Sequence, residues 1–452
     1  MHKISITTKA IQNSFDYPKN WKAMLSFCFF SFLSYFVIKM IQFSKLALLR
    51  VQRPKKEMVI SMENLPQESV SHILSRLPAR ELLKCKCVCK SWLHLICDPH
   101  FTTNYYSFHN QIHSQEEHLL AIQRPFISSL KTKISLLSLT FNDPKNHVNS
   151  TLLNLPEEYN SDHKYWSEIM GPCNGIYFLQ GNPNVMMNPS LRQFKSLPES
   201  HLTDSSNGIY SLTDYASFGF DPKTNDYKVV MLKDIWLKET DERQKGFWTA
   251  EIYSLKSNTW RKLDAKALPL PIEICGSSLS RVYTYVNNCC HWWSFVINES
   301  EGIKEDFILS FDMVNEVFRK IKVPKTCESS KETFIALAPF EKSSTIGVIV
   351  YPIRGNVKHF DVWMMRDYWD EGSWIKQYSV GPIEYVVDRL MVFNGSNRFL
   401  WKCNNDELVL IEHESHKIRD LRVKDSDKFD DSFRAVVHKE SLVLLQRGHN
   451  HF

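Results

Sequence analysis

The sequence predicts a small all-α domain of three helices followed by a large all-β domain of propeller-like repeats. Helical periodicity is concentrated in residues 62–105. After Phe101, short runs of Val, Ile, Phe, Tyr and Trp alternate with Asn, Asp, Ser and Gly, a pattern typical of strands and turns. A hairpin-like pattern also recurs along this second part. With 452 residues, 43% of them hydrophobic, the chain has room for two or three ordinary globular domains.

The expected organisation has four segments. They are a basic extension with an apolar segment (1–61), a helical domain (62–105), a connecting region with the first strands (106–160), and a β-domain (161–452). The extension holds ten Lys or Arg against two acids, a net charge of +8, so the remainder of the +5 chain carries −3. Because residues 62–452 are close to neutral and contain no Lys/Arg tract, their charge does not indicate nucleic-acid binding.

The extension contains an uncharged apolar run of 16 residues, 23–38, and a second apolar patch that continues to residue 49. Sixteen residues are fewer than the roughly 20 that span a bilayer, but the flanking Lys22 and Lys39 could reach the headgroups. One reading is therefore a membrane anchor within residues 23–49. The other is that translation begins at Met58 or Met62, which makes the extension an artefact of the assigned start.

In the helical domain, Val70, Ile73, Leu74 and Leu77 follow the spacing i, i+3, i+4, i+7. This spacing predicts an amphipathic helix that starts at Pro66 and stops before Pro78.

Pro78 can begin a second helix, in which Cys85, Val88, Cys89 and Trp92 repeat the spacing. A third short segment holds Leu95 and Ile96 and ends at Asp98-Pro99. Because so small a unit rarely stabilises itself, we expect it to need a partner.

The β-domain should contain repeated hairpins. Leu119–Ile122 and Ile134–Leu139 read as its first strands. In residues 185–198, 251–264, 308–324 and 408–423, an apolar strand leads through a polar turn to a large apolar anchor followed by cations. The anchors, which the second strand of each hairpin is expected to bury, are Phe194, Trp260, Phe318 and Ile418, and Trp374 subdivides the last interval. Repeats of about 40 to 50 residues predict propeller blades. The alternative is that these β-rich segments resemble one another by chance.

The eleven cysteines are scattered, and we read them as reduced thiols of the cytosol or nucleus. Cys85, Cys87 and Cys89 cannot converge on one ion, because alternate residues of a helix point about 200° apart. Cys85 and Cys89 are expected in the core. We therefore predict no metal and no cofactor.

No nucleophile elbow, phosphate-binding Gly-rich loop or His-Glu-x-x-His is present, so no catalytic residue is predicted. The tryptophans are expected mainly in the cores of blades. A protein target would instead meet polar loops on one rim, namely residues 200–207, 238–246 and 367–372. The residues proposed for target binding are Asp204, Asn207, Asp241, Arg243, Asp367 and Tyr368.

The helical domain resembles the F-box. The resemblance rests on Leu65-Pro66, Ile73-Leu74, Leu77-Pro78, Leu82, Val88-Cys89-Lys90-Ser91-Trp92, Ile96 and Phe101. It implies docking on the Skp-type adaptor, and through it on the cullin, of a ubiquitin ligase. The adaptor-binding residues implied are Leu65, Pro66, Val70, Ile73, Leu74, Leu77, Pro78, Leu82, Val88 and Trp92. Cys85 departs from the aromatic residue that relatives often carry.

The rest of the chain resembles the F-box-associated domain of plant F-box proteins, and within these the S-locus F-box group. The matching motifs are Gly171-Pro172-Cys173-Asn174-Gly175, Met187-Asn188-Pro189-Ser190, Phe218-Gly219-Phe220-Asp221, Asp226-Tyr227-Lys228-Val229-Val230, Tyr253-Ser254-Leu255, Thr259-Trp260-Arg261, His291-Trp292, Leu309-Ser310-Phe311-Asp312-Met313, Val362-Trp363-Met364-Met365 and Ser373-Trp374-Ile375-Lys376-Gln377-Tyr378. Such domains are described as kelch-like, but no Gly-Gly doublet occurs here, which argues against a regular kelch propeller.

The resemblance implies a non-catalytic, cytoplasmic or nuclear subunit that recruits a target protein for ubiquitination and degradation. For the S-locus group, the implied target is a pistil ribonuclease in self-incompatibility. The rivals are a β-propeller enzyme or lectin-like module without a ligase role, and a membrane-anchored receptor.

Overall fold

The computed structural model describes residues 66–112, 116–123, 132–140, 147–159, 165–200, 209–237, 243–264, 273–274, 283–298, 303–327, 333–340, 344–352, 358–383, 387–393, 398–403, 408–414, 417–423 and 433–445. The apolar segment 23–49 and Leu65 lie outside these ranges. No helix within them is long and apolar enough to cross a bilayer.

Four helices are described at the start of this range: α2 (Gln67–Leu74), α3 (Ala79–Cys85), α4 (Lys90–Cys97) and α5 (Pro99–Ile112). The first predicted helix is confirmed as α2, with Pro66 immediately before it. The extent of the second was wrong. The N–H groups of Cys87 and Val88 bond to the carbonyls three residues earlier, which tightens and ends α3. The stripe from Cys85 to Trp92 is therefore broken, and Cys89 is exposed rather than in the core.

Helix α5 was not predicted as a helix, and it crosses the expected boundary at residue 105. The Asp98 Oδ1 atom accepts hydrogen bonds from the N–H groups of His100 (2.8 Å) and Phe101 (3.1 Å). Pro99 lies at the first helical position, where its missing N–H costs nothing. Asp98-Pro99, which we read only as a stop signal, therefore ends α4 and also starts α5.

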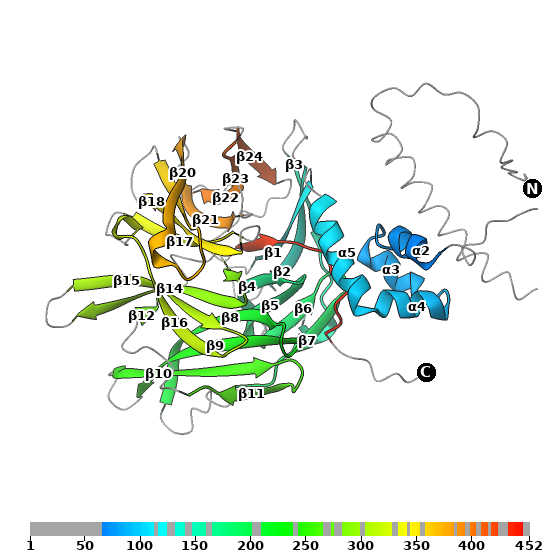
Figure 1. Ribbon diagram of the computed structural model, residues 1–452, viewed down its shortest axis with the longest axis horizontal. Helices are drawn as coiled ribbons and strands as arrows, with labels where there is room; N and C mark the ends of the chain where they lie inside the picture. Colours follow the sequence, from blue (N-terminus) through cyan, green and yellow to red (C-terminus); the bar gives the residue numbers. More distant parts are fainter. Residues whose placement is uncertain are drawn as a thin grey trace, which may run out of the picture.

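The strands that the structure describes form six antiparallel blades (Figure 1). The first blade holds β25 (Arg434–Val437), β1 (Glu116–Gln123), β2 (Lys133–Thr140) and β3 (His147–Leu152). The second holds β4 (Tyr165–Cys173), β5 (Ile176–Asn182), β6 (Val185–Asn188) and β7 (Gln193–Ser196). The third holds β8 (Ile209–Asp221), β9 (Asp226–Leu237), β10 (Arg243–Ser254) and β11 (Thr259–Lys262).

The fourth blade holds β12 (Glu273–Ile274), β13 (Tyr285–Val286), β14 (Cys289–Asn298), β15 (Ile303–Asp312) and β16 (Val317–Lys322). The fifth holds β17 (Thr333–Phe340), β18 (Thr345–Pro352), β19 (Lys358–Met365) and β20 (Trp374–Ile383). The sixth holds β21 (Val387–Phe393), β22 (Arg398–Cys403), β23 (Leu408–Glu412) and β24 (Lys417–Val423). The strands predicted around residues 119–122 and 134–139 are confirmed as β1 and β2.

The ring is closed by strands from the two ends of the described chain. β25 pairs with β1 in the first blade, and β24 of the sixth blade pairs in parallel with β3 of the first. The buried residues of each apolar cluster described in the propeller come mainly from two neighbouring blades. Burial between blades, rather than within one blade, therefore holds the ring together.

The four hairpins with the recurring pattern all join the last two strands of a blade. Their anchors differ in burial. Trp260 is 5% exposed and Phe318 9%, and Phe194 is partly buried, but Ile418 is 38% exposed, so its predicted burial was wrong. The indole N–H of Trp260 donates to the Pro198 carbonyl of the preceding blade (2.8 Å). Isoleucine has no ring or polar atom for such a contact.

Candidate functional site

The N-terminal helices enclose a small apolar core that the propeller completes. Among the predicted adaptor-binding residues, four have buried side chains: Val70, Leu74, Leu77 and Leu82. They pack with Phe101 and Tyr105 of α5, with Leu191 of the second blade, and with Leu442 near the C-terminus. The stripe that we expected to need a foreign subunit is thus largely covered by this same chain.

The other described residues of this set are at least partly open to solvent, and we call the surface of α2–α4 that carries them the open face. Pro66, Pro78 and Val88 are exposed, and Ile73 and Trp92 are half-buried. Residues 66–98 carry five Lys or Arg (Arg76, Arg80, Lys84, Lys86, Lys90) and three acids (Glu68, Glu81, Asp98), a net charge of +2. A protein bound here would have to cover apolar side chains and would gain from acidic groups at the edge.

On the propeller, Tyr368 is committed to an internal contact. It lies in the connection between β19 and β20, and its hydroxyl donates to Nε2 of His291 on β14 (2.7 Å). The Nδ1–H of the same imidazole points to the Thr284 carbonyl (3.4 Å). His291 is 5% exposed, so Tyr368 joins the fifth blade to the fourth. Asp367, its neighbour, is exposed.

His291 predicts a loss of stability in mild acid. Burial lowers the pKa of this histidine to about 4, against about 6.5 in an unfolded chain. The stabilisation is therefore complete above pH 6.5 and is lost as the pH falls toward 4. At pH 5 the loss should be about 2 kcal/mol. Urea unfolding at pH 7.5 and pH 5 measures it, and H291Q should reduce the difference. An unchanged difference in H291Q would contradict this assignment.

Trp369, next to Tyr368, is an exposed aromatic residue that we did not select from the sequence. It is 37% exposed, and its φ of 80° is unusual for a residue with a side chain. The Arg319 guanidinium carbon lies 4.9 Å from its ring centroid. Exposed Trp and Arg side chains are frequent in protein-binding surfaces. The sequence signal that could have found it is a Tyr-Trp pair within an otherwise polar loop.

Only some of the other predicted target-binding residues lie in the part of the chain that the structure describes. Asp204, Asn207 and Asp241 lie outside the described residues, and Arg243 begins β10. Because consecutive strands of a blade are antiparallel, the chain reverses at alternate ends of the blade. The β19–β20 connection joins third and fourth strands, whereas β9 and β10 are second and third. The candidate loops therefore do not share one rim, and the single-rim expectation was wrong.

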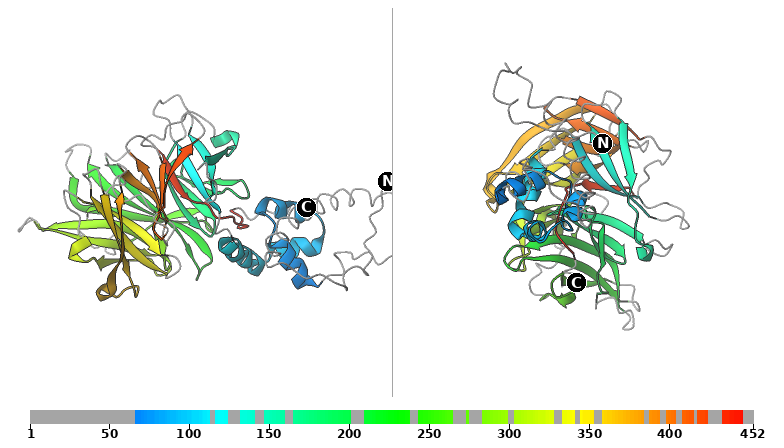
Figure 2. Two further views of the ribbon diagram at one scale, coloured as in Figure 1. Left: turned by 90° about the horizontal axis from the view of Figure 1, so that it is seen from above. Right: turned by 90° about the vertical axis from the view of Figure 1, so that its right-hand side faces the viewer.

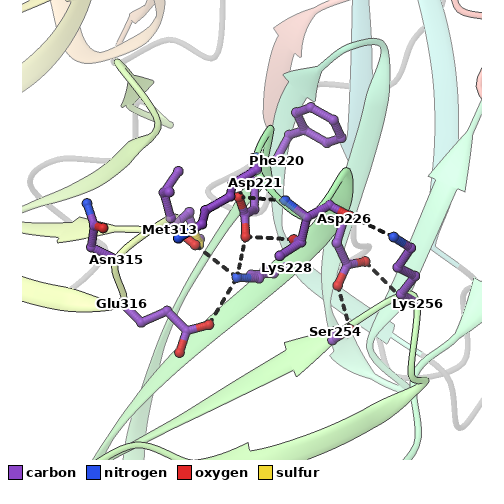
Figure 3. A network of polar contacts seen from close by, with 12 residues as sticks. Phe220, Asp221, Asp226, Lys228, Ser254, Lys256, Met313, Asn315 and Glu316 are labelled. Atoms are coloured by element: carbon purple, nitrogen blue, oxygen red, sulfur yellow. Dashed lines mark hydrogen bonds and ion pairs between the residues drawn. The ribbon is translucent and has the colours of Figure 1, made fainter. Parts of the chain in front are cut away.

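A buried ionic network joins the third and fourth blades (Figure 3). The Lys228 ammonium lies 2.7 Å from Asp221 and 3.0 Å from Glu316, and it donates to the Met313 carbonyl (3.0 Å). Burial alone raises the pKa of Asp221, but hydrogen bonds from Lys228 and Thr224 outweigh it and lower the pKa below its usual value. Asp221 and Lys228 belong to motifs of the resemblance, and their role here is to bind one blade to the next.

A second polar cluster has the residue types of a catalytic site. Lys233 Nζ donates to Ser200 Oγ (2.6 Å), and Ser200 Oγ donates to Glu251 Oε2. A Ser with an adjacent base can act as a nucleophile only if a substrate can reach it. Lys233 and Glu251 are each 1% exposed and Ser200 is 8% exposed. The burial of these three side chains supports a structural role in the third blade rather than a catalytic one.

Within the described ranges, no group of three or more His, Cys, Asp or Glu side chains could hold a metal ion. Cys85, Cys87, Cys89 and Cys97 are not in disulfides.

A small helical domain with an open apolar and cationic face, attached to a six-bladed propeller, defines a two-part binding protein. Residues 62–106 match the F-box-like family and residues 125–444 match the family of the F-box associated beta propeller domain. The chain therefore belongs to the F-box proteins that carry an F-box associated propeller, as the resemblance to plant F-box proteins predicts.

Curated relatives include proteins of Arabidopsis thaliana. The F-box protein CPR1 is 26% identical over 404 residues, which cover 86% of this chain and 90% of the relative. An F-box/kelch-repeat protein is 24% identical over 365 residues, covering 77% of this chain and 90% of the relative. Among solved structures, an oligogalacturonate lyase in complex with manganese aligns with a TM-score of 0.36 and 10% identity, covering 70% of this chain and 81% of that one. So distant a likeness says nothing about activity.

Proposed function

We propose that this protein is the substrate-recognition subunit of a Skp-cullin-F-box ubiquitin ligase. The observation that carries the proposal is the open face of α2–α4, which combines exposed Val88 and Pro78, half-buried Trp92 and a surplus of cations. This face would bind the Skp-type adaptor and, through it, the cullin. The family to which the chain belongs supports this role.

In this role the protein makes and breaks no bond itself. It raises the effective concentration of a lysine of the target near the ubiquitin-charged conjugating enzyme carried by the cullin. The propeller would hold the target, and the exposed Trp369–Arg319 pair with Asp367 is the described surface that best fits such contacts. The cytosol or nucleus is the compartment proposed.

A single charge on the open face tests the adaptor contact. Val88 is 39% exposed, so V88D should change the stability of the chain by less than about 0.5 kcal/mol. If Val88 lies in the interface, a buried carboxylate without a partner should weaken adaptor capture at least about tenfold. The measurement is co-purification of the full chain with a purified Skp-type adaptor.

The matched control is V317D on the propeller, because Val317 is a valine of similar exposure, 36%. It should leave adaptor capture unchanged. Truncating an interior residue such as Leu74 would not discriminate, because its effect would come from damage to the helical core. Equal capture by V88D and wild type would remove this face from the proposed interface. No capture by the wild type would favour a propeller enzyme or a binding module without a ligase role.

The finer proposal concerns the target. The resemblance to the S-locus group supports a secreted-type pistil ribonuclease and a role in self-incompatibility. Such ribonucleases are generally basic, and the net charge of −3 for residues 62–452 would not repel them. Affinity purification from pollen and from leaf, each mixed with pistil extract, tests it. A ribonuclease should be recovered with the pollen material only, and its absence there would exclude this target class.

A further inference from the structure

The segment that follows β25 runs between the propeller and the helices. In Figure 1 it leaves the ring beside α5, and in Figure 2 it lies between the propeller and the helices that project from it. Leu442 is 4% exposed and belongs to the apolar core of the helices. Leu445 is also 4% exposed but belongs to the core between the second and third blades. One short segment is therefore anchored in both parts.

On the propeller side, the segment is held by residues of the second blade. The side-chain amide of Asn188 donates to the carbonyls of Ser441 (3.2 Å) and Val443 (2.8 Å), and Asn188 is fully buried. The Tyr177 hydroxyl accepts from the N–H of Lys439 (2.9 Å). These contacts fix the backbone of the segment rather than its side chains.

Gly175 allows the close approach of this segment. Its φ is +72°, and a Cβ atom there would lie 2.4 Å from the Cβ of Ser441 and 2.8 Å from the Lys439 carbonyl oxygen. Gly175 and Asn188 come from the two motifs that open the resemblance in the β-domain. Neither motif is needed to explain adaptor or target binding, and the structure shows both against the C-terminal segment.

On the helical side, the segment adds to the apolar contact of Leu442 a polar contact made by one carboxylate. Glu440 Oε2 accepts from the N–H of Ala79 (3.0 Å) and from the hydroxyl of Tyr105 (2.7 Å). Ala79 opens α3, whose own preceding residue, Pro78, supplies no side-chain cap. Glu440 thus caps α3 from the far end of the chain and joins it to α5. Ala79 and Tyr105 are both fully buried, so loss of the carboxylate would remove the acceptor that these two buried donors share.

We propose that residues 438–445 are a clamp that holds the N-terminal helices in one orientation on the propeller, with Glu440 as its positioning residue. The functional meaning of this clamp rests on the proposed ligase role. There, a fixed angle between the adaptor-binding face and the propeller determines which lysines of a bound target reach the conjugating enzyme. A flexible joint would spread the target over many positions and lower the effective concentration of any one lysine.

The test measures the distance between the two parts in the full-length chain. Nitroxide labels are placed by Ser69→Cys on α2 and Val317→Cys on β16, in a background without other reactive thiols, and pulsed electron resonance gives the distance distribution. The wild type should show one narrow distance. In E440A the distribution should become at least about twice as wide. E440Q should restore the narrow distribution, because its amide oxygen can still accept both hydrogen bonds.

E199A is the matched control, because Glu199 is an exposed glutamate of the propeller, and it should leave the distribution unchanged. Y105F removes one of the two donors and provides an intermediate case if E440A disturbs folding. A broad distribution in the wild type, or equal widths in wild type, Y105F and E440A, would overturn the clamp. Adaptor capture by the same samples is scored separately. Its absence in the wild type would refute the ligase role while leaving the distance result to decide the clamp.

Discussion

Truncation after residue 432 will abolish cooperative folding of the propeller. The deletion removes β25, which pairs with β1 from Leu119↔Val437 to Ile122↔Arg434. It also removes Phe433 and Ala435 from the core between the sixth and first blades, and Val436 from the core between the first and second. Loss of a buried Phe alone costs about 3–5 kcal/mol, and a whole domain is stable by only about 5–15 kcal/mol.

The loss of folding free energy is expected to exceed the sum for these side chains, because the deletion also removes the strand that closes the ring. Without β25, the inner edge of β1 has unpaired backbone groups, and the Arg434 contact with Glu168 of β4 (3.1 Å) is gone. Near-ultraviolet circular dichroism and urea unfolding measure the result. A second truncation after residue 439 keeps β25 and removes most of the clamp, so its propeller should still unfold cooperatively. Wild-type unfolding of the shorter chain would contradict strand closure.

The second large effect is expected at Lys228. K228M would leave Asp221, whose side chain is only 1% exposed, without its cation, whereas Glu316 would keep its ion pair with Arg261. Breaking a buried ion pair by removing one partner costs roughly 3–5 kcal/mol, because the remaining charge has lost both its solvent and its counterion. We expect a loss of this size in the free energy of urea unfolding at pH 7.

The matched control is K376M. The Lys376 ammonium lies 2.8 Å from Asp361, a distance similar to that of the Lys228–Asp221 pair, but its side chain is 43% exposed. A pair so open to solvent contributes about 0–1 kcal/mol. Comparable losses in the two variants would show that Lys228 does not depend on burial for its effect, and the role given to this network would then fail.

Much of the fold could be predicted because the strongest signals are local. The spacing from Val70 to Leu77 gave α2, and the alternation of apolar strands with polar turns gave the propeller class. The predicted burial of the hairpin anchors is confirmed at Trp260 and Phe318, is only partial at Phe194 and is wrong at Ile418. The break between α3 and α4 was missed, because the apolar spacing continues across a turn that only the backbone hydrogen bonds reveal.

The candidate sites were predicted less completely. The sequence marked an adaptor-binding stripe, but it could not separate Leu74, which is interior, from Val88, which is open. Tyr368 was selected as a loop residue for target binding, yet its hydroxyl is used by His291, 77 residues earlier in the chain. Trp369 beside it is marked in the sequence only by the Tyr-Trp pair in a polar loop, and its exposure and positive φ become visible only in the structure.

The sequence by itself determined what depends on neighbours along the chain: the helical start, the β-rich remainder, the recurring hairpins and the family motifs. Only the tertiary structure decided which end of the chain closes the ring, which apolar residues are left open, and that Glu440 caps α3 across 361 residues. The physical reason is that burial and hydrogen-bond partners are set by contacts between distant segments. Periodicity shows that a residue is buried against other residues, and the fold determines which residues these are.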